Sequence, residues 1–280
     1  MKKVIKIGLT TWSEHGHLFQ KNQLTLLEYA STFPVVEVDT FFYAIPHPDT
    51  VKKWVEQTPD SFKFIVKAHQ AMTLHRSWSD FFESEKEMYV RYEAAISPIK
   101  YSGKLAAILF QFPPTFRCET ASLVYLKRLK RICGKLPVAV EFRHQSWLSP
   151  EYKDKTIAFL TYHQLTLVTV DEPQVPDESV PYMPVTTTKT TGVVRLHGRS
   201  LEGWQKKGED WRKFRTLYRY NERELASLQK DFIKMAQEVE SLYVIFNNNS
   251  GGDAGVNALN VIESMKLEYH DLHPKQTTLF

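Results

Sequence analysis

Short runs of apolar and often β-branched residues recur along the chain, and longer stretches with helical spacing separate them. Most of the runs are bounded by Pro, Gly or Asp, which is typical of β-strands. Eight runs are predicted to be strands, at 5–11, 35–42, 62–69, 105–112, 138–143, 166–171, 193–197 and 242–247.

The stretches between these runs predict helices, because their apolar residues recur every three or four positions. The clearest is 224–240, and others are predicted at 24–32, 50–57, 78–99, 123–133 and 151–163. The link 171–192 differs, since it carries four prolines and a run of threonines. Proline removes a backbone donor and interrupts a helix, so we expect an irregular long loop after the sixth strand.

Strand and helix alternate along the chain, which predicts parallel strands. The 280 residues match the size of one closed α/β barrel, typically about 250 residues. We therefore predict an α/β fold in which residues 1–280 form a single TIM-type (β/α)8 barrel domain. An open doubly wound sheet also fits the alternation.

The two faces of the predicted strands differ in polarity. Residues two positions apart share a face of a strand, so Glu37, Asp39 and Phe41 lie opposite Val36 and Val38. The other strands divide similarly, and their mixed faces are formed by Ile65, Lys67 and His69; Ala107, Leu109 and Gln111; Ala139, Glu141 and Arg143; Leu167, Thr169 and Asp171; Val193, Arg195 and His197; and Ile245 and Asn247. Because outer helices cover apolar faces, we predict that the mixed faces point into the barrel.

Polarity increases toward the carboxyl end of these strands, which is where barrel enzymes place their active sites. The ionisable residues predicted to face inward are the acids Glu37, Asp39, Glu141 and Asp171 and the bases Lys67, Arg143 and Arg195. One interpretation is a lattice of salt bridges that closes the barrel. We favour a small-molecule pocket, because barrel interiors are ordinarily filled by branched aliphatic residues.

Within such a pocket, Glu37 and Glu141 are candidates for a general acid and a general base. Two carboxylates in different surroundings hold different pKa values, which suits them to these two roles. Lys67, Arg143 and Arg195 would hold an anionic group, the arginines by two parallel hydrogen bonds.

A metal-dependent hydrolase or isomerase is an alternative. Its ligands would be carboxylates together with His69, His75, His144 or His197. Three basic side chains in one cavity repel a cation, so no residue is assigned to a metal.

Residues 204–221 interleave basic side chains with Trp204, Trp211, Phe214, Tyr218 and Tyr220. Aromatic stacking beside cations is one way of holding single-stranded nucleic acid. We favour a segment that caps the barrel mouth, since no recognised nucleic-acid module is visible. A non-catalytic nucleic-acid or polyanion-binding protein is kept as an alternative function.

The bulk composition is that of an ordinary globular protein, with 42% hydrophobic and 24% charged residues. The longest apolar run, 105–110, is far shorter than the roughly 20 residues of a membrane-spanning helix. The start has no signal-peptide pattern, and Cys118 and Cys133 have no metal-ligand spacing. We expect a cytoplasmic protein with no membrane partner.

Several of these segments together resemble the domain of unknown function 72 (YecE-like) family. The resemblance is carried by 35–43, 58–68, 109–114, 141–147, 193–199 and 246–249, with Pro46 and Trp54. It implies a TIM-type barrel and brings no assigned activity. The family's usual motif residues fall on Glu37, Phe42, Tyr43, Lys67, Gln111, Glu141, Arg143, Trp147, Arg195, His197 and Asn247.

We therefore expect an enzyme that uses acid/base chemistry on a small anionic substrate, phosphorylated or sugar-like. Glu37 and Glu141 are the expected catalytic residues. The expected substrate-binding residues are Tyr43, Lys67, Gln111, Arg143, Arg195, His197 and Asn247. The sequence indicates no particular cofactor, reaction class or oligomeric state.

Overall fold

Eight strands close into a parallel barrel. The structure is a computed structural model that describes residues 4–175, 179–206, 208 and 214–274. Neighbouring strands pair in chain order, and the last pairs with the first. The strands are β1 (Val4–Thr10), β2 (Val35–Val38), β3 (Lys63–Lys67), β4 (Leu105–Gln111), β5 (Val138–Glu141), β6 (Thr166–Asp171), β7 (Thr191–Leu196) and β8 (Ser241–Phe246). The prediction of a TIM-type (β/α)8 barrel is confirmed, and the open sheet is wrong.

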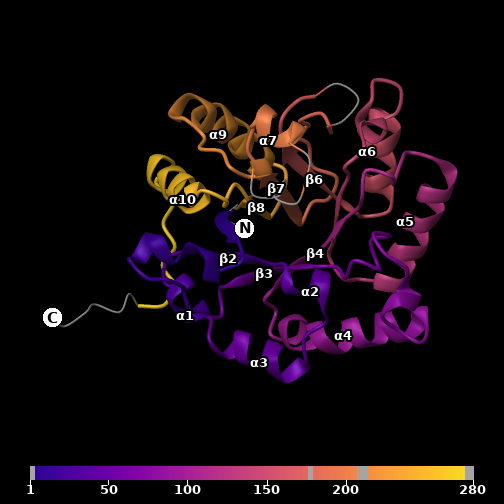
Figure 1. Ribbon diagram of the computed structural model, residues 1–280, viewed down its shortest axis with the longest axis horizontal. Coiled ribbons are helices and arrows are strands. Elements are labelled where there is room, and N and C mark those ends of the chain that lie inside the picture. Colours follow the sequence, from indigo (N-terminus) through magenta and orange to yellow (C-terminus); the bar gives the residue numbers. More distant parts are fainter. Residues whose placement is uncertain (1–3, 176–178, 207, 209–213, 275–280) are drawn as a thin grey trace.

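Helices surround the barrel wall (Figure 1). They are α1 (Leu26–Tyr29), α2 (Thr40–Tyr43), α3 (Pro48–Glu56), α4 (Glu85–Tyr101), α5 (Thr120–Cys133), α6 (Lys153–Tyr162), α7 (Leu201–Gln205), α9 (Glu222–Ala236) and α10 (Asp253–Ser264). In the part of the chain that the structure describes, no helix is both long and apolar enough to cross a membrane.

Two of the helix predictions need correction. The predicted helix 78–99 is divided into the 3-10 turn η2 (Trp78–Asp80) and α4, because the Ser84 hydroxyl accepts a hydrogen bond from the Glu87 amide and starts a new helix there. The sequence reasoning also missed α10, which follows Gly252 with φ 77°. Glycine adopts this left-handed conformation without a steric penalty, so it marks the start of that helix.

Two apolar layers line the barrel wall. The outer layer includes Ile7, Val36, Phe64, Ile108 and Val244, which contribute to the core shared with the helices. The inner layer includes Val35, Ile65, Leu109, Val193 and Ile245. Two residues farther along each of these inner strands stand Glu37, Lys67, Gln111, Arg195 and Asn247. The inner core therefore fills the amino end of the barrel, and polar side chains fill the carboxyl end.

The face assignment is confirmed for β2, β3, β4, β5, β7 and β8, but it is wrong for β6. Val168 and Val170 face inward, while Leu167 packs in the outer core. The Thr169 hydroxyl donates a 2.9 Å hydrogen bond to the Met183 carbonyl. The irregular loop after β6 covers this outer face in place of a helix, as its prolines predict. Backbone carbonyl groups of the loop accept hydrogen bonds from polar side chains of β6.

Two predicted strands also end early. Strand 35–42 stops at Val38, where α2 takes over, so Phe41 packs outside against Trp54 and Tyr92. Strand 62–69 stops at Lys67, and the buried His69 contacts Phe81. Neither Phe41 nor His69 continues the inward face, because the alternation of a strand ends with the strand.

Gly8 makes a close approach that the barrel depends on. A Cβ atom at Gly8 would lie 2.1 Å from the Val35 carbonyl oxygen, whereas one at Gly192 would lie 2.7 Å from the Leu242 Cδ1 atom. The first neighbour is backbone and the second is the end of a movable side chain. We expect Gly8→Ala to lower the free energy of unfolding by about 2–3 kcal/mol and Gly192→Ala by under about 1 kcal/mol in urea titrations. Equal losses would contradict this account.

Candidate functional site

Arg195 lies at the centre of the carboxyl end and bonds two carboxylates. Its Nε and Nη2 atoms lie 2.8 Å and 2.5 Å from the two oxygens of Glu37. Its Nη1 atom lies 2.5 Å from Glu141 Oε2. The side chain of Arg195 is 1% exposed and both glutamates are fully buried. Three residues from three separate strands thus form one buried ion cluster, as the strand alternation predicted.

Arg143 is a second arginine that pairs with two carboxylates, and it shares Glu141 with Arg195. Its Nη2 atom lies 2.6 Å from Glu141 Oε1, and its Nη1 atom lies 2.5 Å from Glu172 Oε2. The sequence reasoning placed Asp171 here, which is wrong, because Asp171 bonds Arg199 outside the barrel. Glu172 takes its place, since the alternation in β6 is shifted by one residue. The apolar pair Val168 and Val170 was the signal for this shift.

A chain of polar contacts links β1, β8 and β7. The Thr10 hydroxyl donates to Asn247 Oδ1 at 2.7 Å, and Asn247 Nδ2 lies 2.7 Å from His197 Nδ1. His197 Nε2 lies 2.9 Å from Arg143 Nη2. Burial lowers the pKa of His197 well below its usual range, and Arg143 adds to this effect. His197 is therefore neutral at physiological pH. No role is predicted for Thr10 from the sequence, because its hydroxyl carries no charge that would mark it as a site residue.

The remaining expected residues lie toward the β2 to β4 side. Lys67 Nζ lies 3.8 Å from Asp39 Oδ1 and 4.8 Å from the ring centre of Phe42. Gln111 Oε1 accepts a 3.2 Å hydrogen bond from Arg195. Tyr43 is 59% exposed, and its ring contacts Phe42. The predicted site residues thus lie at the carboxyl end of the barrel, where all of them except the exposed Tyr43 are at least partly buried.

The two glutamates have opposite tendencies to hold a proton. Complete burial raises the pKa of Glu37 to about 8, although the charge of Arg195 opposes this change. Burial also opposes ionisation of Glu141, but Arg143 and Arg195 surround it and hold its pKa well below the usual range. Glu37 therefore takes up a proton more readily than Glu141 does, while its two hydrogen bonds from Arg195 favour the ionised form. This division is the one that a general acid and its partner base require.

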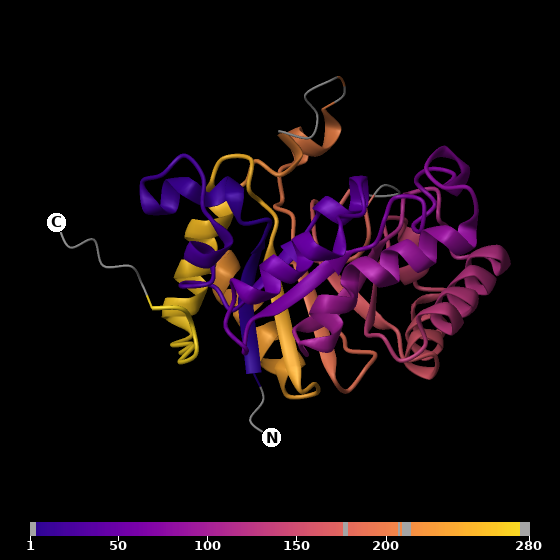
Figure 2. The same cartoon turned by 90° about the horizontal axis from the view of Figure 1, so that it is seen from below.

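A cavity of about 660 Å³ opens at this end of the barrel, lined by Pro114, Thr115, Arg117, Arg143, His144, Trp204 and Arg215. The segment around α7 projects beyond the carboxyl ends of the strands (Figure 2), and the guanidinium carbon of Arg215 lies 3.7 Å from the centre of the Trp204 ring. The cavity wall holds three guanidinium groups and no carboxylate. Its chemistry suits an anion.

Arg143 connects this cavity to the buried cluster. Its side chain is only 10% exposed. Its Nε atom is buried and has no hydrogen-bond acceptor in the described residues. A buried donor without an acceptor costs about 1–3 kcal/mol, and an acceptor that reached this atom would remove that cost.

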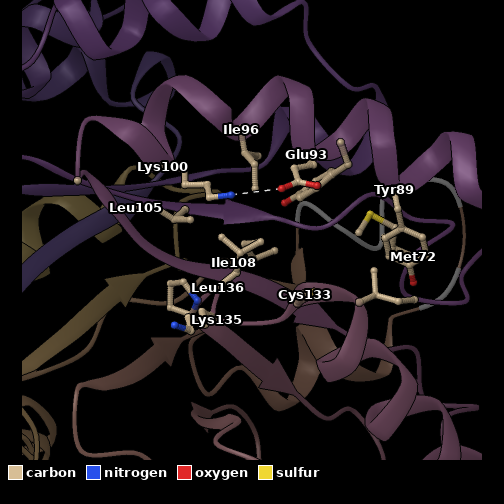
Figure 3. Close-up of a pocket in the computed structure, with 14 residues that line it drawn as sticks. Met72, Tyr89, Glu93, Ile96, Lys100, Leu105, Ile108, Cys133, Lys135 and Leu136 are labelled. Atoms are coloured by element: carbon tan, nitrogen blue, oxygen red, sulfur yellow. Dashed lines mark hydrogen bonds and ion pairs between the residues drawn. The ribbon is translucent and has the colours of Figure 1, made fainter.

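A separate cavity of about 340 Å³ lies on the outer side of the barrel (Figure 3). Its wall is mainly apolar, with Ile96 from α4 and Ile108 from β4, and an ion pair of Glu93 and Lys100 at its rim. It shares no lining residue with the barrel-mouth cavity. The ionisable residues predicted to act are absent from it.

The alternatives from the sequence fare differently. Across the described ranges, no three His, Cys, Asp or Glu side chains cluster as metal ligands would. In the stretch 204–221, Tyr220 is buried and donates a hydrogen bond to Asp171, and Tyr218 donates one to Glu224. Trp211 lies outside the described residues. Nucleic-acid binding by this stretch stays a prediction.

Comparison with known proteins relates the chain to a single family. Residues 6–279 match the family described as "Protein of unknown function DUF72". The chain is 41% identical over 282 residues to the UPF0759 protein YunF of Bacillus subtilis (strain 168), covering 99% of this chain and 100% of that protein. It is 28% identical over 159 residues to the UPF0759 protein YecE of Escherichia coli (strain K12), covering 55% of this chain and 54% of that protein.

Solved structures show the same fold. A DUF72 family protein from Enterococcus faecalis V583 superposes with a TM-score of 0.94 at 41% identity, covering 98% of this chain and 100% of that one. A DUF72 family protein from Thermotoga maritima MSB8 gives a TM-score of 0.79 at 30% identity, covering 94% and 99%.

The buried cluster predicts a large loss of stability when one charge is removed. Glu141→Gln leaves two buried guanidinium groups with one charged partner fewer, so we expect it to lower the free energy of unfolding by about 3–5 kcal/mol. The control is Glu85→Gln, which breaks an ion pair with Arg128 on the surface and is expected to cost under about 1 kcal/mol. Urea unfolding checks both, and a loss for Glu141→Gln as small as that of the control would contradict the geometry.

The neutral His197 predicts a pH dependence. Its pKa is lowered in the folded protein from an ordinary value of 6.5, so below that value the unfolded chain takes up a proton that the folded protein does not. We expect the stabilising contribution of His197 to be present above about pH 6.5 and to be lost progressively as the pH falls below that value. Thermal unfolding of His197→Asn should therefore approach that of the wild type at low pH. A gap independent of pH would oppose this assignment, and His270, whose side chain is 77% exposed, supplies a control substitution.

Proposed function

Since the chain belongs to the family described as "Protein of unknown function DUF72", whose name assigns no activity, we propose a function from the barrel mouth itself. We infer an enzyme that binds a small anionic substrate at the carboxyl end of the barrel and converts it by acid/base chemistry. The anion contacts Arg143 and its neighbours in the cavity, and Glu37 and Glu141 supply and accept the proton.

The observation that carries the proposal is the asymmetry of the cluster. Of the two arginines in the cluster, Arg143 lines the cavity and is 10% exposed, whereas Arg195, Glu37 and Glu141 are buried. A ligand entering the mouth therefore meets guanidinium groups first. Arginine binds carboxylate or phosphate through paired, charge-assisted hydrogen bonds, so this surface selects anions.

The same contacts suggest how a bound anion reaches the acid/base pair. Arg143 is shared between Glu141 and Glu172. An anion bound to Arg143 competes with Glu141 for its donors. Weaker pairing raises the proton affinity of Glu141, which then acts as a base. Glu37, whose pKa is about 8, provides the proton on the other side of Arg195.

Anion binding is tested at the rim, where a substitution leaves the buried cluster intact. Arg117 is exposed and lines the cavity, so we expect Arg117→Gln to weaken binding of inorganic phosphate about tenfold, or about 1.4 kcal/mol. Calorimetric titration measures it. The matched control is Arg131→Gln, an exposed arginine of α5, which should leave the affinity unchanged. Phosphate binding that is unaffected by Arg117→Gln, or absent from the wild type, would contradict the proposed site.

Turnover is tested by incubating the protein with mixtures of phosphorylated and carboxylated metabolites and following them by NMR. We expect Glu37→Gln to reduce any conversion by at least about 100-fold, in keeping with the usual contribution of a general acid. The wild-type rate should fall above about pH 8 as Glu37 loses its proton. Conversion that survives Glu37→Gln with an unchanged pH profile would remove Glu37 from the reaction.

A further inference from the structure

The side of the mouth around β1 and β2 is acidic. It contrasts with the arginine wall, which is formed by Arg117, Arg143 and Arg215. Asp39 follows β2, and its Oδ1 atom is buried without a hydrogen-bond partner in the described residues. Glu14 belongs to the 3-10 helix η1 (Ser13–Phe19) and accepts a hydrogen bond from Asn249. Burial raises the pKa of Glu14, and the negative charge of Asp39 contributes to this shift.

The arginine wall comes from segments that follow other elements of the same closed ring. Arg117 follows β4, Arg143 follows β5, and Arg215 follows α7. In the closed order, β5 lies four strands from β1. A ligand that extended from the arginine-lined cavity to Asp39 would meet guanidinium groups at one end and a carboxylate at the other.

The groups around Asp39 identify what the second end of the ligand carries. Lys67 Nζ stands 3.8 Å from Asp39 Oδ1, so an ammonium group on the ligand would be repelled by Lys67 and an anionic group by Asp39. A hydroxyl group satisfies both neighbours, because it donates to the carboxylate and accepts from the lysine. Gln111 and Asn247 add neutral amides to the same interior.

We propose that the substrate of the barrel mouth is a phosphorylated sugar or polyol. Its phosphate lies against Arg117, Arg143 and Arg215, and its hydroxyl groups lie between Asp39 and Lys67. This inference rests on the proposed function and specifies its substrate class. A phosphate ester carries about two negative charges at neutral pH and presents three acceptor oxygens, which suits three guanidinium groups better than a single carboxylate does.

The test compares affinities within a small set of probes. Calorimetric titrations of the wild type use inorganic phosphate, ribose 5-phosphate, glucose 6-phosphate, sorbitol 6-phosphate and unphosphorylated ribose. At least one of the phosphorylated probes should bind about tenfold or more tightly than inorganic phosphate, and ribose should bind much more weakly than any of them. The gain over phosphate measures recognition of the hydroxyl end.

Asp39→Asn separates the two ends of the ligand. We expect it to abolish the gain of the sugar phosphates while leaving the affinity for inorganic phosphate unchanged, whereas Arg117→Gln weakens both. Glu14→Gln is a second variant of the acidic side and is titrated with the same probes as Asp39→Asn. Thermal unfolding checks that both variants fold. Asp49→Asn, an exposed aspartate of α3, is the control and should behave as the wild type.

The possible failures are distinguishable. If phosphate binds but none of the phosphorylated probes binds more tightly, or if Asp39→Asn weakens phosphate as much as the sugar phosphates, the inferred substrate class is wrong and the anion site stands. If neither phosphate nor any phosphorylated probe binds, the proposed function fails together with it.

Discussion

The bidentate pairing of Arg195 with Glu37, shared on its other side with Glu141, is the interaction around which the carboxyl end of the barrel is organised. All three side chains are buried, and a buried charge is tolerated only with close partners. The barrel must therefore close with β2, β5 and β7 in one fixed register. Arg143 extends the same pairing to Glu172, and its buried Nε atom has no hydrogen-bond partner in the described residues.

The charge seen by a ligand follows from this burial. The carboxylates occupy the layer beneath, and the guanidinium groups of Arg117, Arg143 and Arg215 reach the cavity above them. A mouth that selects anions is thus compatible with a cluster in which acids and bases nearly balance. In the proposed function, stability and anion binding both depend on Arg143, so substitution of a rim residue such as Arg117 tests binding with less effect on stability.

Much of the fold and part of the site could be predicted from the sequence. Alternation within short strands was enough to bring Glu37, Glu141 and Arg195 to one end, because a side chain's face depends only on its own strand. The same reasoning failed at Asp171, since the loop that covers β6 makes its outer face polar. The cavity wall could not be predicted, because Arg117 and Arg215 come from connecting segments whose paths depend on tertiary packing.

The most direct measurement is a crystal structure of the protein grown with inorganic phosphate, at a resolution that shows hydrogen-bond geometry. The account predicts a phosphate oxygen within hydrogen-bonding distance of Arg143 Nε, with Arg117 and Arg215 around it and Arg195 still bonded to Glu37. An empty mouth at saturating phosphate, or an Arg143 whose Nε faces only protein atoms, would contradict it.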